Sequence, residues 1–479
     1  MTRDETIEPR GVRRRIRRWV LVGILLLLLV GFAGFRMTLQ RMYHDRLEAI
    51  RAGGEPATFA DIEKTLRDLP PEQNAAFLIE EASRHYDNWH WTRKVINVPI
   101  CNGGLQPGRD EPLAAEVKAD AAAYLNDNAQ ALKFLHQAAA IGQAVFARDL
   151  TFNASLPHLS PIRRGSELLN LEGVLAAENG EDATAAQCFA DALRLANQLR
   201  EEPFLISHIV RIKGDETTLY GIERAVNRTG FTGIQLVALT KAINEADDAD
   251  AFYRAILSER CCMTDVASRP VSSLMGPAGF DRQTLWNAFY FFSGFYSVDR
   301  ICLVDRMTEL VGAARLPTHR RMAAINAWQS EVENLPRYRL MLQLLQTVIN
   351  RVCLADLNHL GQVRAAGAGL AVERYRLAHG RYPETLDALV PEFLDAVPED
   401  PFDGKPLRYQ ARANGFVVYS VGHDLADNGG RERDVAGASR VFGGSPALVR
   451  PYPPGSDVTF AVGPQPEPAL SLPAGGPPR

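Results

Sequence analysis

One apolar run near the N-terminus constrains this chain more than any other feature of its sequence. Residues Trp19 to Phe35 carry no charge, and the run is 17 residues long. As a helix it spans about 25 Å, slightly less than a hydrocarbon core of ~30 Å. Arg18 and Arg36 flank the run and can extend their guanidinium groups to the interface, where Trp19 also fits. We therefore expect one transmembrane helix at residues 19–35.

The arginines around this run predict its orientation. Six of them lie between residues 10 and 18, whereas Arg36, Arg41 and Arg46 follow it. The positive-inside rule then makes residues 1–18 a cytoplasmic basic segment and leaves nearly the whole chain outside the cytoplasm. A cleaved signal peptide is the alternative, because Gly31 and Ala33 are small, but the run exceeds the roughly 7–15 residues of a usual signal core. Since no later run is comparably apolar, we expect a single-pass protein of the bacterial inner membrane.

Composition narrows the function classes. The net charge of −4 gives no reason to expect a nucleic-acid partner. The six cysteines include no CxxC pair, which argues against a zinc ribbon or a redox pair and favours buried free thiols, with one or two disulfides as the alternative. No phosphate-binding loop, GxSxG or HExxH motif is present. The sequence therefore gives no positive reason to propose an enzymatic activity.

Residues 36–335 read as a helical extracytoplasmic body, rich in alanine and leucine. A helical hairpin at residues 166–197 stands out, with Gly173 on one helix, Gly180 in the turn and Phe189 on the returning helix. This spacing resembles one tetratricopeptide repeat, although Asn197 stands where that repeat prefers proline. Because a solenoid needs about three repeats and one copy is found, we expect a hairpin inside a larger bundle.

Two acidic pairs in this body invite interpretation as paired carboxylates. They are Glu201-Glu202 and Asp247-Asp248. Neighbouring helical residues point about 100° apart. We therefore expect both pairs to lie on solvated faces.

The next segment, residues 336–442, changes character. A long helical pattern runs from Pro336 to His379, and Gly380 followed by Pro383 ends it. A short helix at 385–389, two strands at 407–411 and 416–421 with an Asn414-Gly415 turn, and an acidic glycine loop at 422–430 follow. Residues 443–479 are rich in proline and glycine and predict a largely disordered tail, in which 457–462 is the only strand-like piece.

The order of these motifs carries a resemblance. Gly380-Arg381-Tyr382-Pro383, then Asp400-Pro401-Phe402-Asp403-Gly404, then Tyr419-Ser420-Val421-Gly422-His423-Asp424 are similar to the C-terminal half of the major pseudopilin of type II secretion systems, over residues 365–430. The resemblance implies a helix packed on a small antiparallel sheet and a terminal loop that binds calcium. Asp424 and Asp427 are the ligands that it implies, since calcium takes carboxylate and carbonyl oxygens. Solvated turns are the alternative for these residues.

The anchor departs from that family. Pseudopilins carry a glutamate within the first apolar turns, and their long helix is itself the membrane span. Here the apolar run lacks that glutamate and lies some 320 residues before the matching helix. The whole chain is more similar to large membrane-anchored proteins of planctomycete-type bacteria that end in this unit.

The expected fold is therefore mainly α: a single N-terminal transmembrane helix, a helical-bundle body and a small α+β C-terminal unit. The expected function is that of a membrane-anchored extracytoplasmic scaffold or interaction protein of the bacterial envelope, with protein partners. A component associated with the pseudopilus of a type II-like secretion system and an envelope hydrolase are the alternatives.

Overall fold

The structure is a computed structural model. It describes residues 10–66, 69–86, 108–146, 149–269, 290, 293–336, 339, 346–432, 452 and 455–464. The described chain is mainly helical, with one long apolar N-terminal helix and a small antiparallel sheet near the C-terminus, which confirms the predicted fold class.

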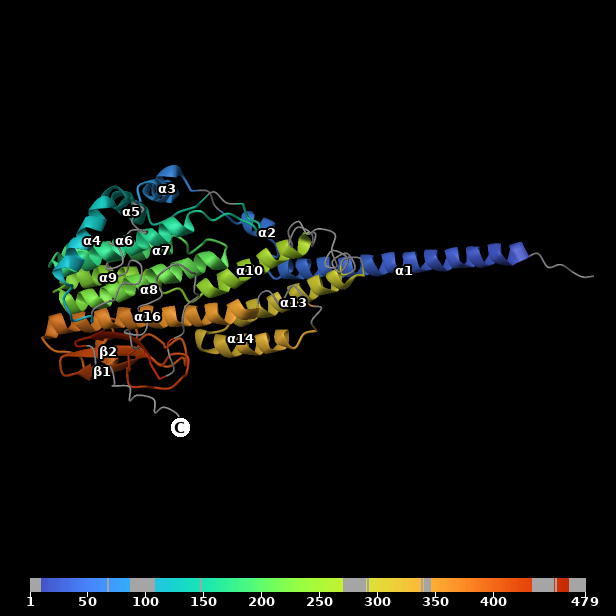
Figure 1. The fold of residues 1–479 in the computed structure, drawn as a ribbon. Helices are drawn as coiled ribbons and strands as arrows, with labels where there is room; N and C mark the ends of the chain where they lie inside the picture. The colour runs from blue at the N-terminus through green and yellow to red at the C-terminus, as the bar shows by residue number, and fades with distance from the viewer. Residues whose placement is uncertain are drawn as a thin grey trace, which may run out of the picture.

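Figure 1 shows the arrangement of the helices and strands. The helices are α1 (Arg10–Ala52), α2 (Phe59–Glu63), α3 (Ala76–Arg84), α4 (Ala115–Asp127), α5 (Ala129–Ile141), α6 (Leu159–Glu178), α7 (Asp182–Asn197), α8 (Leu205–Arg228), α9 (Gly233–Ala246), α10 (Ala251–Ser268), α13 (Phe295–Ala314), α14 (Thr318–Glu333) and α16 (Gln346–His379). Short 3-10 turns are η1 (Pro71–Gln73) and η4 (Leu386–Leu389), and the strands are β1 (Arg408–Arg412), β2 (Gly415–Ser420) and β3 (Val458–Val462).

Helix α1 is long and apolar enough to cross a membrane. Its apolar window is not buried inside the protein, and Figure 1 shows this half extending clear of the body. The helix has 43 residues and is therefore about 65 Å long, twice the thickness of a hydrocarbon core. A helix of this length that crossed a membrane would therefore have about half of its length outside the hydrocarbon core.

The second half of α1 is part of the body. Leu39 and Tyr43, one helical turn apart, are buried against Ile301 and Val304 of α13. The guanidinium of Arg300 lies 3.8 Å from the centre of the Tyr43 ring, a cation–π contact. The helix therefore runs from the apolar segment into the body without a linker.

The hairpin predicted at 166–197 is confirmed as α6 and α7. A Cβ on Gly173 would lie 2.8 Å from the ring of Phe189, so glycine is required where the helices meet. The turn has Gly180 in the left-handed conformation, at φ 77°. The likeness to a tetratricopeptide repeat stays a prediction.

Helix α16 lies between the body and the sheet (Figure 1). Its alanines and leucines join one core with α6, α7, α8 and α9 on one side and with the sheet on the other. The helix runs uninterrupted through Gly367 and Gly369 to His379. A Cβ on Gly369 would clash with the ring of Phe460, so glycine at this position leaves room for β3 to pack against α16. The predicted segments 36–335 and 336–442 thus share a core.

The sheet has the order β1-β2-β3, with both pairs antiparallel. Arg412 pairs with Gly415, which makes Ala413-Asn414 the turn, one residue earlier than predicted. The sequence predicted two strands and a tail that is largely disordered; β3 lies inside that tail and makes the third strand. Its pairing with β2 buries Val458 and Ala461, and it coincides with the strand-like piece predicted at 457–462. Helix α16 ends before Gly380, as predicted, and this glycine takes the left-handed conformation, at φ 71°.

Candidate binding cleft

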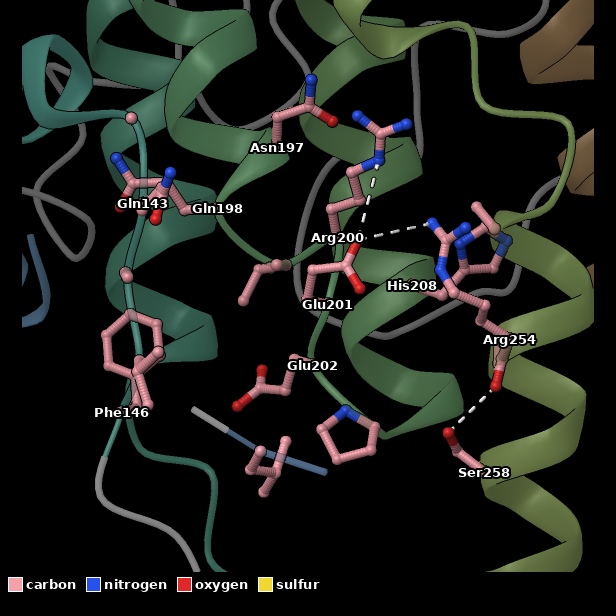
Figure 2. Close-up of a pocket in the computed structure, with 18 of the residues that line it drawn as sticks. Gln143, Phe146, Asn197, Gln198, Arg200, Glu201, Glu202, His208, Arg254 and Ser258 are labelled. Carbon is pink, nitrogen blue, oxygen red and sulfur yellow. Dashed lines mark hydrogen bonds and ion pairs between the residues drawn. The ribbon is translucent and has the colours of Figure 1, made fainter. Parts of the chain in front are cut away.

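A cleft with a volume of about 870 Å³ opens where several helices end together. That volume lies within the range of small-ligand sites, about 300–1,000 Å³. Figure 2 shows Gln143 and Phe146 on one side, Arg254 and Ser258 on the other, and Glu201 and Glu202 on the segment between them.

Local chain geometry creates the cleft. Gly142 ends α5 in the left-handed conformation, at φ 76°, and releases the chain into an extended segment along one wall. Helix α7 ends at Asn197, and Pro203 cannot continue it. The side chain of Asn197 donates to the carbonyl of Glu245 over 2.9 Å and accepts from Arg211 over 3.3 Å. This residue, unusual for a tetratricopeptide repeat, thus ties α7 to the ends of α8 and α9.

Two arginines meet on one buried carboxylate at the cleft. Asp248 accepts from Arg200 Nε over 2.5 Å and from the guanidinium of Arg254. Its side chain is 5% exposed. Burial alone would raise the pKa of Asp248, but the hydrogen bonds from Arg254 and Arg200 hold it at about 2. Two positive charges therefore share one negative charge.

Glu201 covers this arginine pair loosely. Its carboxylate lies 4.0 Å from Arg200 Nε and 4.0 Å from the Arg254 guanidinium (Figure 2), and its side chain is 79% exposed. Such an exposed pair at the limit of contact contributes little. The arginine pair is thus accessible to a competing anion.

Buried polar atoms complete the lining. Gln198 is 6% exposed; its amide nitrogen donates to the carbonyl of Ala138, and its Oε1 has no partner among the described residues. Arg254 Nε is also buried without a partner there. Ser258 Oγ donates to the carbonyl of Arg254 over 2.9 Å and keeps accepting capacity. Both unpartnered atoms have almost no solvent-accessible surface, so a ligand in the cleft would meet the exposed parts of the arginine side chains.

The structure corrects the prediction that both acidic pairs are solvated. Asp248 is buried under the arginines, and Glu202, whose side chain is 4% exposed, pairs with His158 at 2.8 Å. Only Glu201 is strongly exposed. Adjacent residues at helix ends face different neighbours, and a helix-face argument cannot distinguish them.

His208 reaches the cleft from a buried network. Its ring lies 3.1 Å from Asp356, whose carboxylate also lies 3.6 Å from Arg321. Burial lowers the pKa of His208, against the opposing effect of Asp356. These contacts link α8, α14 and α16 beneath the cleft floor.

The predicted calcium ligands lie elsewhere, in the loop after β2. Asp424 accepts from the backbone N–H of Gly455 over 2.9 Å. Asp427 accepts from the hydroxyl of Tyr419 and from the N–H of Gly429, both over 3.0 Å. Calcium binding at these two residues stays a prediction.

A third carboxylate organises that loop. Asp457, fully buried at the start of β3, accepts from the N–H groups of Gly430 over 2.8 Å and of Arg431 over 3.2 Å. This role of Asp457 was not predicted from the sequence, because the residue lies in the predicted disordered tail. The cleft arginines were missed because one follows α7, the other lies on α10, and they carry no motif. The five cysteines in the described ranges, by contrast, are free thiols as expected.

Comparisons of this chain with protein-family models, with curated proteins and with solved structures found no match.

Proposed function

We propose that this chain is a single-pass, membrane-anchored scaffold or interaction protein of the bacterial envelope, whose extracytoplasmic body holds a carboxylate-bearing segment of a partner protein in the cleft. The observation that carries the proposal is the pair Arg200 and Arg254 on the buried Asp248, with only Glu201 loosely over it. Arginine pairs suit carboxylates because their N–H groups match both oxygens.

The exposed parts of the two arginines favour a carboxylate ligand. The side chains of Arg200 and Arg254 are 39% and 33% exposed, so their guanidinium groups can meet a ligand in the cleft. A ligand carboxylate would take the place of Glu201 between the arginines. An acidic side chain or a chain terminus meets these requirements.

The experiment is photocrosslinking in cells. A photoreactive residue at position 201, where the side chain is exposed, should give a discrete adduct with another protein. Arg254→Gln should reduce that adduct at least tenfold. The matched control carries the photoreactive residue at Ile234, which is 84% exposed on α9. Equal adduct patterns from positions 201 and 234, or an adduct that Arg254→Gln leaves unchanged, would reject the proposal.

The C-terminal unit supports a second candidate, association with a pseudopilus-like secretion apparatus. Its observation is that α16 packs on a small antiparallel sheet in the order that the resemblance implies. Deleting the gene should then reduce the amount of secreted protein in the medium. Unchanged secretion would remove this candidate.

A further inference from the structure

A mixed group of ligand atoms lies where α5 meets the helical hairpin, and none of its residues lines the cleft. His136 comes from α5, Glu172 from α6 and Cys188 from α7, and one ligand atom from each lies within 4.8 Å of the other two. We propose that these three side chains bind a zinc ion. This inference is independent of the proposed function.

The ligand types fit zinc in particular. Zinc binds imidazole nitrogen, thiolate sulfur and carboxylate oxygen at about 2.0–2.3 Å, which places neighbouring ligand atoms about 3.3–3.7 Å apart in a tetrahedron. His136 Nε2 and Glu172 Oε2 are 2.9 Å apart, so a small rotation admits the ion. A hard cation such as calcium would be poorly served by the thiolate and the imidazole.

A neighbouring carboxylate already orients the histidine as a metal ligand requires. Asp191 Oδ2 lies 2.8 Å from His136 Nδ1, which leaves Nε2 facing Glu172. Asp191 is itself fixed, because its Oδ1 accepts from Gln187 over 2.9 Å and from Arg194 over 3.4 Å. Zinc-binding histidines nearly always donate their second N–H to such a group. Asp191 is therefore a positioning residue.

Solvent reaches the site from one side. The side chains of His136 and Glu172 are 32% and 29% exposed, while Cys188 is buried. Three protein ligands with an open side leave the fourth position for water or for an anionic ligand. Sites that are purely structural are usually closed by four protein ligands.

The same contacts have an alternative meaning without an ion. His136 would then bridge two carboxylates as a hydrogen-bonded cation, and Cys188 would be an ordinary buried thiol. The experiment must therefore detect the metal itself, and the thiolate as its ligand.

The test uses the full-length chain, purified in detergent without a metal-affinity tag. After loading with zinc and exhaustive dialysis, elemental analysis should find about one zinc per chain. Cys188→Ser and His136→Gln should each lower zinc affinity at least a hundredfold. The matched control is Cys353→Ser, another buried cysteine in a helix, which should retain the metal. Equal zinc content in the wild type and in Cys188→Ser would overturn the proposal.

Cobalt substitution supplies a readout that depends on the ligand and not only on folding. The cobalt-loaded wild type should show a thiolate-to-cobalt charge-transfer band, which Cys188→Ser abolishes while its circular dichroism stays native. Asp191→Asn should keep the band and weaken binding about 10- to 100-fold. If Cys188→Ser fails to fold, the wild-type spectrum decides, because absence of the band rejects the thiolate ligand.

Discussion

Asp248 carries the only negative charge in close contact with both cleft arginines among the described residues, so its titration should be visible in stability. Its folded pKa is about 2, below the ordinary value of 3.8. A lowered carboxylate pKa stabilises the fold above pH 3.8, and this contribution is lost as the pH falls toward 2. The free energy of unfolding of the wild type relative to Asp248→Asn should shrink by about 2 kcal/mol between pH 5 and pH 2.

The control for this prediction is Asp250→Asn, an exposed residue two positions along the same loop, directly before α10. Its difference from the wild type should stay nearly constant over that range. Chemical denaturation at each pH measures both. A constant difference for Asp248→Asn would show that the arginines do not hold its carboxylate ionised.

At the scale of elements, the half-buried Glu223 and the neighbouring Asn227 of α8 both hydrogen-bond the chain at β3. Glu223 on α8 accepts from the N–H of Ala461 over 2.9 Å. Burial raises the pKa of Glu223 to about 7, against the opposing effect of Arg109. A raised carboxylate pKa stabilises the fold at low pH, and that stability is lost as the pH rises from 4.5 through 7.

Glu223→Gln should therefore remove a pH dependence. Wild-type stability relative to this variant should fall by about 2–3 kcal/mol between pH 4.5 and pH 7.5. Glu216→Gln, on the same helix and paired with Lys213 at 2.6 Å, is the control and should keep the wild-type slope. Equal slopes for the wild type and Glu223→Gln would contradict this account of the β3 contact.

Gly369 tests the packing of α16 against the sheet. Gly369→Ala places a methyl group against the Phe460 ring and should destabilise the fold by about 1–3 kcal/mol. Gly312→Ala on α13 meets nothing within 4 Å and should stabilise by about 0.5–1 kcal/mol, because alanine favours helix. Opposite changes in melting temperature for the two variants would support the packing of α16 against β3. If Gly369→Ala left the melting temperature unchanged, β3 could move away from α16 at little energetic cost.

Local sequence patterns predicted some elements of this fold and not others. The helical character of the apolar run, the hairpin at Gly173 and Phe189, and the end of α16 at Gly380 are local signals, and each was predicted correctly. Strand β3 was underestimated because glycine and proline around it indicate disorder, while its pairing with β2 is long-range. The cleft could not be predicted, because Arg200, Asp248 and Arg254 meet only through the packing of α7, α9 and α10.

At the scale of the whole molecule, α1 joins the apolar segment to the body as one helix. The contacts of Tyr43 and Arg300 should hold the body at a fixed orientation relative to the apolar segment. The arginines before the apolar run predict that the body lies outside the cytoplasm. Alkaline phosphatase fused after residue 464 should be active, and green fluorescent protein fused there should be dark. The reverse pattern would place the cleft in the cytoplasm.

The central claim is that the cleft holds a partner through charge, and a charge swap tests it most directly. Arg254→Glu should abolish the adduct formed from position 201. Mapping the wild-type adduct identifies the acidic residue of the partner that lies in the cleft. Replacing that residue by arginine should restore the adduct with Arg254→Glu and weaken it with the wild type. An adduct that survives Arg254→Glu, or that the swap fails to restore, would contradict the account.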